Sequence, residues 1–355
     1  MSRRNKPCSA TRMKAARFDA LTADYSKLRV AVIGDFCLDR YLEIDPGKTE
    51  TSIETGLPVH NVVNIRSQPG GAGTILNNLV ALGIREIIPV GFCGEDGEGW
   101  ELRRALQAKR GVRMDHFVPT LQRRTFTYTK PLLVKPGKPP EELNRLDIKN
   151  WTPTPPSIVE CLQQAAWYLA SHVDAFILLD QVDLANTGVV STRVLEMIER
   201  IAREFPGLLI LADSRRGLRD YPKVTFKMND AELARLTRSR PTSDPVKIQK
   251  QAAAHSRKQG RRVFVTMAER GIIGADPCGE VHHVPAFPVR GEIDVVGAGD
   301  AVTANLTTAL AAGASLEESL EIAMLGASIV THQLGTTGTA SVPELRTLAQ
   351  GVEAA

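Results

Sequence analysis

The sequence has few aromatic residues and no long apolar segment. Aromatic side chains make up 5% of the 355 residues, so Val, Ile, Leu and Ala must supply most of a core drawn from a 43% apolar composition. Such a composition is typical of a parallel sheet that is covered by helices. No apolar run approaches 18 residues, the minimum for a membrane-spanning helix, so we expect no membrane association.

Cysteine is also scarce. The five cysteines are an odd number, lie far apart and include no CxxC pair. This arrangement argues against a disulfide framework and against a zinc site. No apolar segment follows the basic N-terminus, so a secretory signal is not expected. We therefore expect a protein of a reducing compartment, the cytoplasm.

The excess of positive charge is confined to the N-terminus. The chain has 44 basic and 40 acidic residues. Residues 1–17 contain no acid but six basic residues, namely Arg3, Arg4, Lys6, Arg12, Lys14 and Arg17. The rest of the chain therefore has 38 basic residues (44 less 6) against 40 acidic ones, which argues against nucleic-acid binding. We interpret residues 1–27 as a disordered basic extension, with a transit peptide as the alternative, and residues 346–355 as a C-terminal tail.

From residue 28 onward, short apolar runs alternate with helical patterns. We predict strands over residues 28–35, 85–94, 175–180, 208–213 and 262–266, and helices over residues 158–171, 192–205, 245–259 and 299–312. The alternation predicts right-handed β-α-β units around a mostly parallel sheet with helices on both faces. Polar and β-branched residues within 40–67 and 120–134 predict a small β lid. Ligands of such folds bind at the carboxyl ends of the strands.

The strongest chemical signal is DVVGAGD, residues 294–300, which precedes a long apolar helix. Gly297 and Gly299 let backbone amides crowd together, and the free N–H groups of a helix start form an anion site. Asp300 would lie in the first turn beside that site. A carboxylate next to phosphoryl oxygens can accept a hydroxyl proton, which is the chemistry of phosphoryl transfer. The alternative interpretation is an ordinary capped helix after a glycine-rich turn.

With PGGAG at residues 69–73, this motif makes the chain resemble the ribokinase-like (PfkB) sugar kinases. It is most similar to the kinase domain of the bifunctional ADP-heptose synthesis enzymes, over roughly residues 28–340 and most clearly in segments 34–41, 54–59, 69–83, 129–130, 144–147, 297–319 and 334–338. The resemblance implies an α/β three-layer sandwich in one kinase domain, residues 28–345. It also implies use of ATP and Mg²⁺, with a monovalent cation as a further candidate. The HxGH-type signature of the nucleotidyltransferase half is absent, so we expect kinase chemistry alone.

The resemblance also assigns roles to individual residues. It makes Asp300 the base that deprotonates the acceptor hydroxyl, and the amides of Gly297, Ala298 and Gly299 the anion hole. The implied sugar-side residues are Asp35, Asp39, Gly70, Gly71, Thr74 and Asp180, and the implied nucleotide-side residues are Asn229, Thr266, Glu269 and Gly271. Within the N-x-x-E element, Glu232 would organise magnesium through water. The alternative for this element is a helix N-cap followed by an acid in the first turn.

The chain departs from the family pattern mainly on the substrate side. Thr74, Val296 and Met324 stand where the family usually has Asn, Thr and Asn, and Asp183 replaces a lysine of the heptose kinases. Arg215 is a candidate to compensate for that lysine. The sequence therefore predicts a kinase of a sugar or sugar phosphate, without naming the sugar. A nucleoside or other small-alcohol kinase and a non-catalytic nucleotide or sugar sensor remain alternatives, and the family resemblance suggests a homodimer through the lid.

Overall fold

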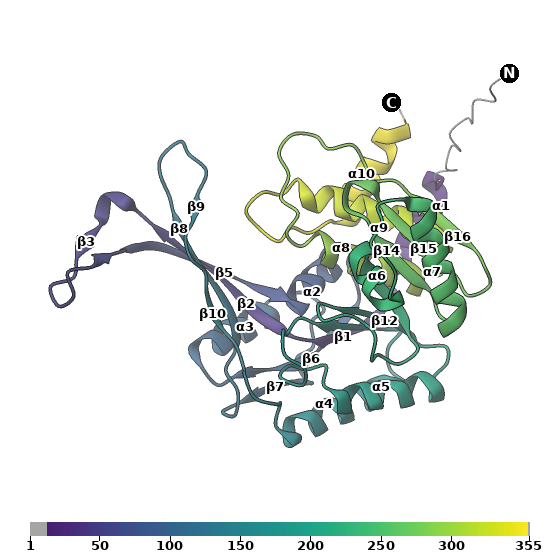
Figure 1. Cartoon of the computed structure of the whole chain (residues 1–355), viewed down its shortest axis with the longest axis horizontal. Coiled ribbons are helices and arrows are strands. Elements are labelled where there is room, and N and C mark those ends of the chain that lie inside the picture. Colours follow the sequence, from purple (N-terminus) through teal and green to yellow (C-terminus); the bar gives the residue numbers. More distant parts are fainter. Residues whose placement is uncertain (1–12, 354–355) are drawn as a thin grey trace.

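The computed structural model describes residues 13–353, which form a large sheet between two layers of helices and a smaller sheet that projects from it (Figure 1). The large sheet has the strand order β16-β15-β14-β13-β12-β11-β1-β6-β7. Its strands are β1 Arg29–Gly34, β6 Glu86–Gly94, β7 Phe117–Thr120, β11 Ala175–Asp180, β12 Leu209–Ser214, β13 Thr225–Asn229, β14 Val263–Thr266, β15 Ile272–Ala275 and β16 Val281–Val284. Pairing is parallel from β7 to β14, whereas β15 and β16 pair antiparallel.

Helices cover both faces of this sheet. They are α2 Ala72–Ala81, α3 Gly97–Gln107, α4 Pro156–Leu169, α5 Thr192–Glu204, α6 Asp230–Thr237, α7 Pro245–Gln259, α8 Ala298–Ala311, α9 Leu316–Thr331 and α10 Val342–Glu353. Successive strand residues point to opposite faces. Ala31 and Ile33 of β1 accordingly pack in the cluster that includes α4, α5 and α7, whereas Val30 and Val32 pack with α2 and α8. The predicted three-layer α/β architecture is confirmed.

The projecting sheet is the lid. It consists of β2 Phe36–Ile44, β5 Val62–Gly71, β8 Phe126–Leu133 and β10 Leu146–Ile148 in the order β10-β8-β2-β5, with β9 Glu141–Glu142 paired to β8. The short strands β3 Glu50–Thr51 and β4 Pro58–Val59 lie at its far tip (Figure 1). Strand β5 runs to Gly71, which is also the N-cap of α2, so the glycine pair of the PGGAG motif joins a lid strand directly to a helix.

Both ends of the described chain are more ordered than the sequence predicted. Residues 1–12 lie outside the described residues, but α1 Ala15–Ala23 and the 3-10 turn Tyr25–Lys27 fold against the body. They bury Phe18, Leu21 and Tyr25, so disorder is wrong for this half of the extension. Residues 346–353 of the predicted tail belong to α10. Within the described range, no helix has both the length and the apolar character needed to cross a bilayer.

Candidate active site

A cavity of about 150 Å³ lies where the carboxyl ends of β1 and β11 meet the lid and the start of α8. Its lining residues are Asp35, Cys37, Asp39, Gly71, Thr74, Phe126, Tyr128, Gln181, Val182, Val296, Gly297, Asp300 and Thr337. The structure thus brings together six of the residues predicted from the sequence, although they come from widely separated segments of the chain.

Asp39 reaches this cavity from lid strand β2. Glycine is required beside it, because a Cβ on Gly70 would lie 2.4 Å from the Asp39 carboxylate. Gly71 follows with φ +56, and a Cβ there would lie 2.5 Å from the Asp35 carbonyl oxygen. Burial raises the pKa of Asp39, while Lys130 and Arg145 lower it. The predicted glycine pair therefore makes room for the acidic side chain, and Gly70 itself does not line the cavity.

The start of α8 forms the opposite wall. Gly297 precedes the helix with φ +82, a conformation that favours glycine. Asp294 holds the turn, since its carboxylate accepts hydrogen bonds from the Val296 N–H (3.0 Å) and the Gly335 N–H (3.3 Å). Of the three amides predicted as an anion hole, the Ala298 N–H already donates to the Val295 carbonyl at 3.2 Å. The free first-turn amides next to it keep the helix start suited to an anion.

Asp300 lies half-buried in the first turn of α8. Burial raises the pKa of its carboxyl group, Lys227 opposes this shift, Asp213 and Asp39 add to it, and the resulting pKa is about 7. Among residues 13–353, no hydrogen-bond donor contacts the Asp300 carboxylate. The group is therefore free to accept a proton from a molecule in the cavity.

Lys227 is a site residue that the sequence analysis missed. It is buried on β13, and its Nζ lies 2.6 Å from Asp213 Oδ2, which also accepts from Thr303 Oγ1 at 3.3 Å. A Cβ on Gly299 would lie 3.3 Å from the same Nζ, so the ammonium group stands at the start of α8. Although it is paired with Asp213, it places an ammonium donor beside the start of α8. The only available signal was a lysine two positions before Asn229, in a strand that was not predicted.

Two acidic residues predicted to bind the sugar have other partners. Asp180 is fully buried behind the cavity and accepts hydrogen bonds from Arg216 (2.6 Å), Ser214 (3.0 Å) and Tyr221 (3.1 Å). Asp35 lines the cavity, but its carboxylate accepts from the backbone N–H groups of Val189 (2.7 Å) and Gln181 (2.8 Å). Asp35 therefore supports the loop that follows β11, whereas the Asp180 side chain binds residues at and after the end of β12.

The pKa of Asp35 reflects this buried pairing. Burial and the neighbouring Asp180 charge raise it, the backbone N–H groups lower it, and the resulting pKa is about 7. A Cβ on Gly188 would lie 2.3 Å from Asp35 Oδ1, so only glycine permits the loop to approach the carboxylate this closely.

The predicted nucleotide-side residues lie outside the cavity, along the carboxyl ends of β13 and β14. Asn229 pairs with Thr266 in the sheet register, and Gly271 has φ +92, where a Cβ would lie 2.0 Å from the Val284 carbonyl oxygen. The Glu269 side chain is 80% exposed beside them. These residues line an open edge next to the start of α8, which is compatible with a second ligand that meets the first near Asp300.

Asn229 and Glu232 form a capping box at α6. Asn229 Oδ1 accepts from the Glu232 N–H (2.8 Å), and Glu232 Oε2 accepts from the Asn229 N–H (2.7 Å), which confirms the helix-cap interpretation. Burial raises the pKa of Glu232, and the Asp213 charge adds to this shift. Glu232 Oε1 lies 3.9 Å from Arg235 and keeps accepting capacity.

This donor set fits magnesium held mostly by phosphate oxygens and water. Residues 13–353 contain no group of three His, Cys, Asp or Glu side chains placed to hold a metal ion. Magnesium commonly keeps several waters and takes one or two carboxylates together with substrate phosphates. Glu232, with one carboxylate oxygen outside the capping box, is the residue that would contact its water shell.

Basic side chains gather over Tyr128 at the lid side of the cavity. Arg145 and Lys149 lie 5.1 and 5.9 Å from the centre of its ring. Asp183, which stands where a lysine was expected, pairs with Lys149 at 2.7 Å and with Arg215 at 3.6 Å. The negative charge of Asp183 is therefore paired with two cations, Lys149 and Arg215.

A family model for the pfkB carbohydrate kinases matches residues 27–343. The bifunctional protein HldE of Azorhizobium caulinodans is 32% identical over 310 residues, covering 86% of this chain and 61% of that protein. HldE of Granulibacter bethesdensis is 30% identical over 332 residues, covering 91% and 65%. The chain thus spans less than two thirds of the length of these relatives.

Solved structures agree on the fold. Phosphofructokinase-2 from Escherichia coli superposes with a TM-score of 0.69 at 18% identity, covering 92% of this chain and 99% of that one. Arabidopsis thaliana ribokinase complexed with ribose and ATP gives a TM-score of 0.63 at 19% identity, covering 92% and 98%.

Proposed function

Because the chain belongs to the pfkB family of carbohydrate kinases, we propose that it transfers the γ-phosphoryl group of ATP to a hydroxyl group of a sugar or sugar phosphate. The observation that carries the proposal is the position of Asp300. Its carboxylate lies in the cavity, beside the anion-binding start of α8 and with no hydrogen-bond donor from the described chain.

The proposed reaction uses the two sides of the site. The acceptor lies in the cavity, where Asp39 accepts hydrogen bonds from its hydroxyl groups. The reacting hydroxyl gives its proton to Asp300 as the oxygen–phosphorus bond forms and the bond to the ADP oxygen breaks. Lys227 and the free first-turn amides of α8 stabilise the charge on the transferring phosphoryl group. Magnesium bound to the nucleotide would neutralise further phosphate charge.

Lys130 and Arg145 favour an acceptor that already carries a phosphate. Lys130 and Arg145 both act on the charge of Asp39, so they lie close to the acceptor side of the cavity. Lys130 forms no salt bridge with a described carboxylate, and Arg145 can share its charge between Asp147 and a phosphate. A heptose phosphate, the acceptor implied by the resemblance, is compatible with this arrangement.

The test is ADP release with ATP and magnesium over a panel of heptose 7-phosphate, fructose, fructose phosphates, ribose and nucleosides. We expect release with one sugar or sugar phosphate, and a loss of at least about a hundredfold in Asp300→Asn. Nucleotide binding should persist in that variant, and Asp115→Asn, an exposed change of the same kind, should leave turnover unchanged.

Other outcomes separate the alternatives. Near-normal turnover in Asp300→Asn would refute the assigned base. Release with nucleosides alone would indicate a nucleoside kinase. No release with any acceptor, while ATP still protects the protein from thermal unfolding, would favour a non-catalytic sensor.

A further inference from the structure

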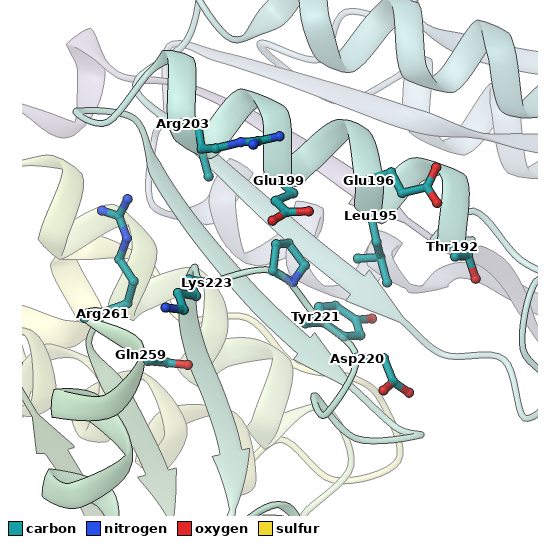
Figure 2. Close-up of a pocket in the computed structure, with 13 residues that line it drawn as sticks. Thr192, Leu195, Glu196, Glu199, Arg203, Asp220, Tyr221, Lys223, Gln259 and Arg261 are labelled. Carbon is teal, nitrogen blue, oxygen red and sulfur yellow. The ribbon is translucent and has the colours of Figure 1, made fainter.

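A groove opens at the amino ends of the strands of the large sheet, opposite the end that holds the candidate active site. It lies beside the connection between β12 and β13, which contains no helix. Every other parallel crossover of this sheet contains at least one helix, but residues 215–224 between β12 and β13 form only turns and bends. The groove has a volume of about 740 Å³ and lies between α5, residues 220–223 and residues 259–261 (Figure 2). Lys223 and Arg261 precede β13 and β14, so it lies at the amino ends of the strands. Its volume is in the range typical of small-molecule sites.

The charged side chains of the groove are separated by sign. Figure 2 shows Arg203, Lys223 and Arg261 toward one end, and Glu196 and Asp220 toward the other, with Glu199 between them. In the described chain, none of these six side chains forms a hydrogen bond or a salt bridge. Arg203, Lys223 and Arg261 are thus three cations of one groove that have no ionic partner in the described chain, and a bound anion would pair with them.

Part of the lining of the groove is apolar. Leu195, Ala202 and Pro222 contribute aliphatic surface to its lining. Figure 2 shows the ring of Tyr221 between Lys223 and Asp220. A flat, partly apolar ring can pack on such a surface while its polar substituents reach the ends.

We propose that this groove binds a small organic phosphate that carries hydroxyl groups, such as a phosphorylated sugar. The phosphate would accept hydrogen bonds from Arg203, Lys223 and Arg261, since guanidinium groups match phosphate oxygens in pairs. The hydroxyl groups would donate to Glu199 and Asp220, because ionised carboxylates only accept. A bare anion would use only the basic end.

The groove shares no lining residue with the candidate active site, yet one hydrogen bond joins their surroundings. Tyr221 contributes its ring to the groove, and its hydroxyl donates to Asp180 at 3.1 Å. Asp180 lies beside Asp35, which holds the loop over the cavity through Gln181 and Val189. A molecule in the groove would therefore contact Tyr221, whose hydroxyl group bonds to Asp180, the acidic neighbour of Asp35.

Calorimetric titration with glucose 6-phosphate tests the proposal without requiring turnover. We expect saturable binding in the millimolar range or tighter, and a loss of at least about tenfold in affinity in Lys223→Gln/Arg261→Gln. Arg240→Gln/Lys247→Gln removes the same charges from exposed positions outside the groove and should bind as the unaltered protein does. Inorganic phosphate should show the same dependence on Lys223 and Arg261 with weaker affinity, whereas glucose should show none.

Asp39→Asn distinguishes the groove from the cavity. Binding that survives Asp39→Asn but fails in the groove variant supports the proposal. Binding that fails in Asp39→Asn and survives in the groove variant places glucose 6-phosphate in the cavity and overturns it. The absence of binding to the unaltered protein at millimolar concentrations overturns it as well, whatever the outcome of the kinase assay.

Discussion

The pKa of Asp300 depends on burial and on neighbouring charges that shift it in opposite directions. Burial and the acidic groups Asp213 and Asp39 raise its pKa, while Lys227 lowers it, and the result is about 7. A base is most useful when its pKa lies near the working pH. This pKa has a cost for the fold: it is above the ordinary value of 3.8, so the ionised carboxylate destabilises the protein as pH rises from about 4 to about 7.

We predict that kcat/KM falls as pH decreases through about 7. Only ionised Asp300 can accept the hydroxyl proton, so activity should decline by roughly tenfold per pH unit below the inflection. Lys227→Met removes the cation that lowers this pKa, and should move the inflection to higher pH. A pH–rate profile for both proteins measures the effect. An inflection that does not move in Lys227→Met would contradict the assignment.

A second prediction concerns Asp35 as a positioning residue. Asp35→Asn replaces one acceptor oxygen with an NH₂ group, which cannot accept from the Val189 or Gln181 N–H. We expect KM for the acceptor to rise about tenfold or more, with little change in nucleotide affinity, because the loop and not the anion site is released. Steady-state kinetics in both substrates measures this.

Gly188→Ala provides an independent perturbation of the same contact. Its Cβ would meet the Asp35 carboxylate from the loop side, so it should raise KM in the same direction. If Asp35→Asn lowers kcat alone and Gly188→Ala leaves KM unchanged, Asp35 acts on the reacting atoms and the positioning role is wrong.

At the scale of elements, the apolar strands of the large sheet were predicted closely, whereas its strand with a charged residue in the middle was missed. β1, β11, β12 and β14 are short runs of Val, Ile, Leu and Ala, and each was predicted close to its observed bounds. Strand β13 was missed because Lys227 interrupts its apolar pattern. That lysine is tolerated inside the sheet only because Asp213 of the neighbouring strand pairs with it, and a single sequence does not reveal this contact.

Helix α1 was missed for a different reason. Phe18, Leu21 and Tyr25 recur at the spacing of one helical face, and all three are buried. The basic residues of the N-terminus led to a prediction of disorder for residues 1–27, in which this helical spacing was not used. The basic residue Arg17 in fact reaches the body of the protein, where it pairs with Glu318 at 2.8 Å.

In the candidate site, sequence motifs identified some residues, but the direction of other side chains depends on partners that are distant in the sequence. The two glycine motifs, at residues 69–73 and 294–300, were visible in the sequence, and Gly71 and Asp300 from them both line the cavity. Asp180 also follows an apolar strand, yet its carboxylate points to Arg216 instead. A residue at a strand end can turn toward either side, and its partner, 36 residues away, decides which.

The contact between lid strand β5 and the loop after α9 carries the third prediction. Gln68 Nε2 donates to Thr337 Oγ1 (2.9 Å), and Thr336 Oγ1 donates to Gln68 Oε1 (3.2 Å). Thr337 lines the cavity and packs beside Gly297. Gln68→Ala removes two hydrogen bonds of about 1 kcal/mol each, so KM for the acceptor should rise by up to about thirtyfold.

Kinetics of Gln68→Ala beside Arg66→Ala measures this effect. Arg66 is on the same strand but pairs with Glu43 at the surface, so its removal should have little influence on KM. Equal effects of the two substitutions would mean that the lid strand as a whole matters, and not its contact with the loop.

At the scale of the whole molecule, the lid exposes an apolar outer face. Asp39, Gln68 and Tyr128 share the inner face by register, so Ile65, Leu146 and Ile148 lie on the outer one. These three side chains are 59%, 62% and 40% exposed. This sheet stands away from the body and exposes apolar side chains on its outer face. Such a surface is suited to contact with a second copy of the chain.

We therefore predict that the protein forms a dimer through the lid. Sedimentation velocity should show twice the mass of the single chain, and Ile65→Asp/Leu146→Asp should convert it to the monomer, because each buried charge is strongly unfavourable at an apolar contact. Val246→Asp, an exposed position on α7, is the matched control and should leave the dimer intact. If the double variant stays dimeric, the contact lies elsewhere. If the unaltered protein is monomeric at all concentrations, the outer face of the lid is not a dimer contact. The lid would then be held over the cavity only by contacts within one chain, such as that of Gln68 with Thr337.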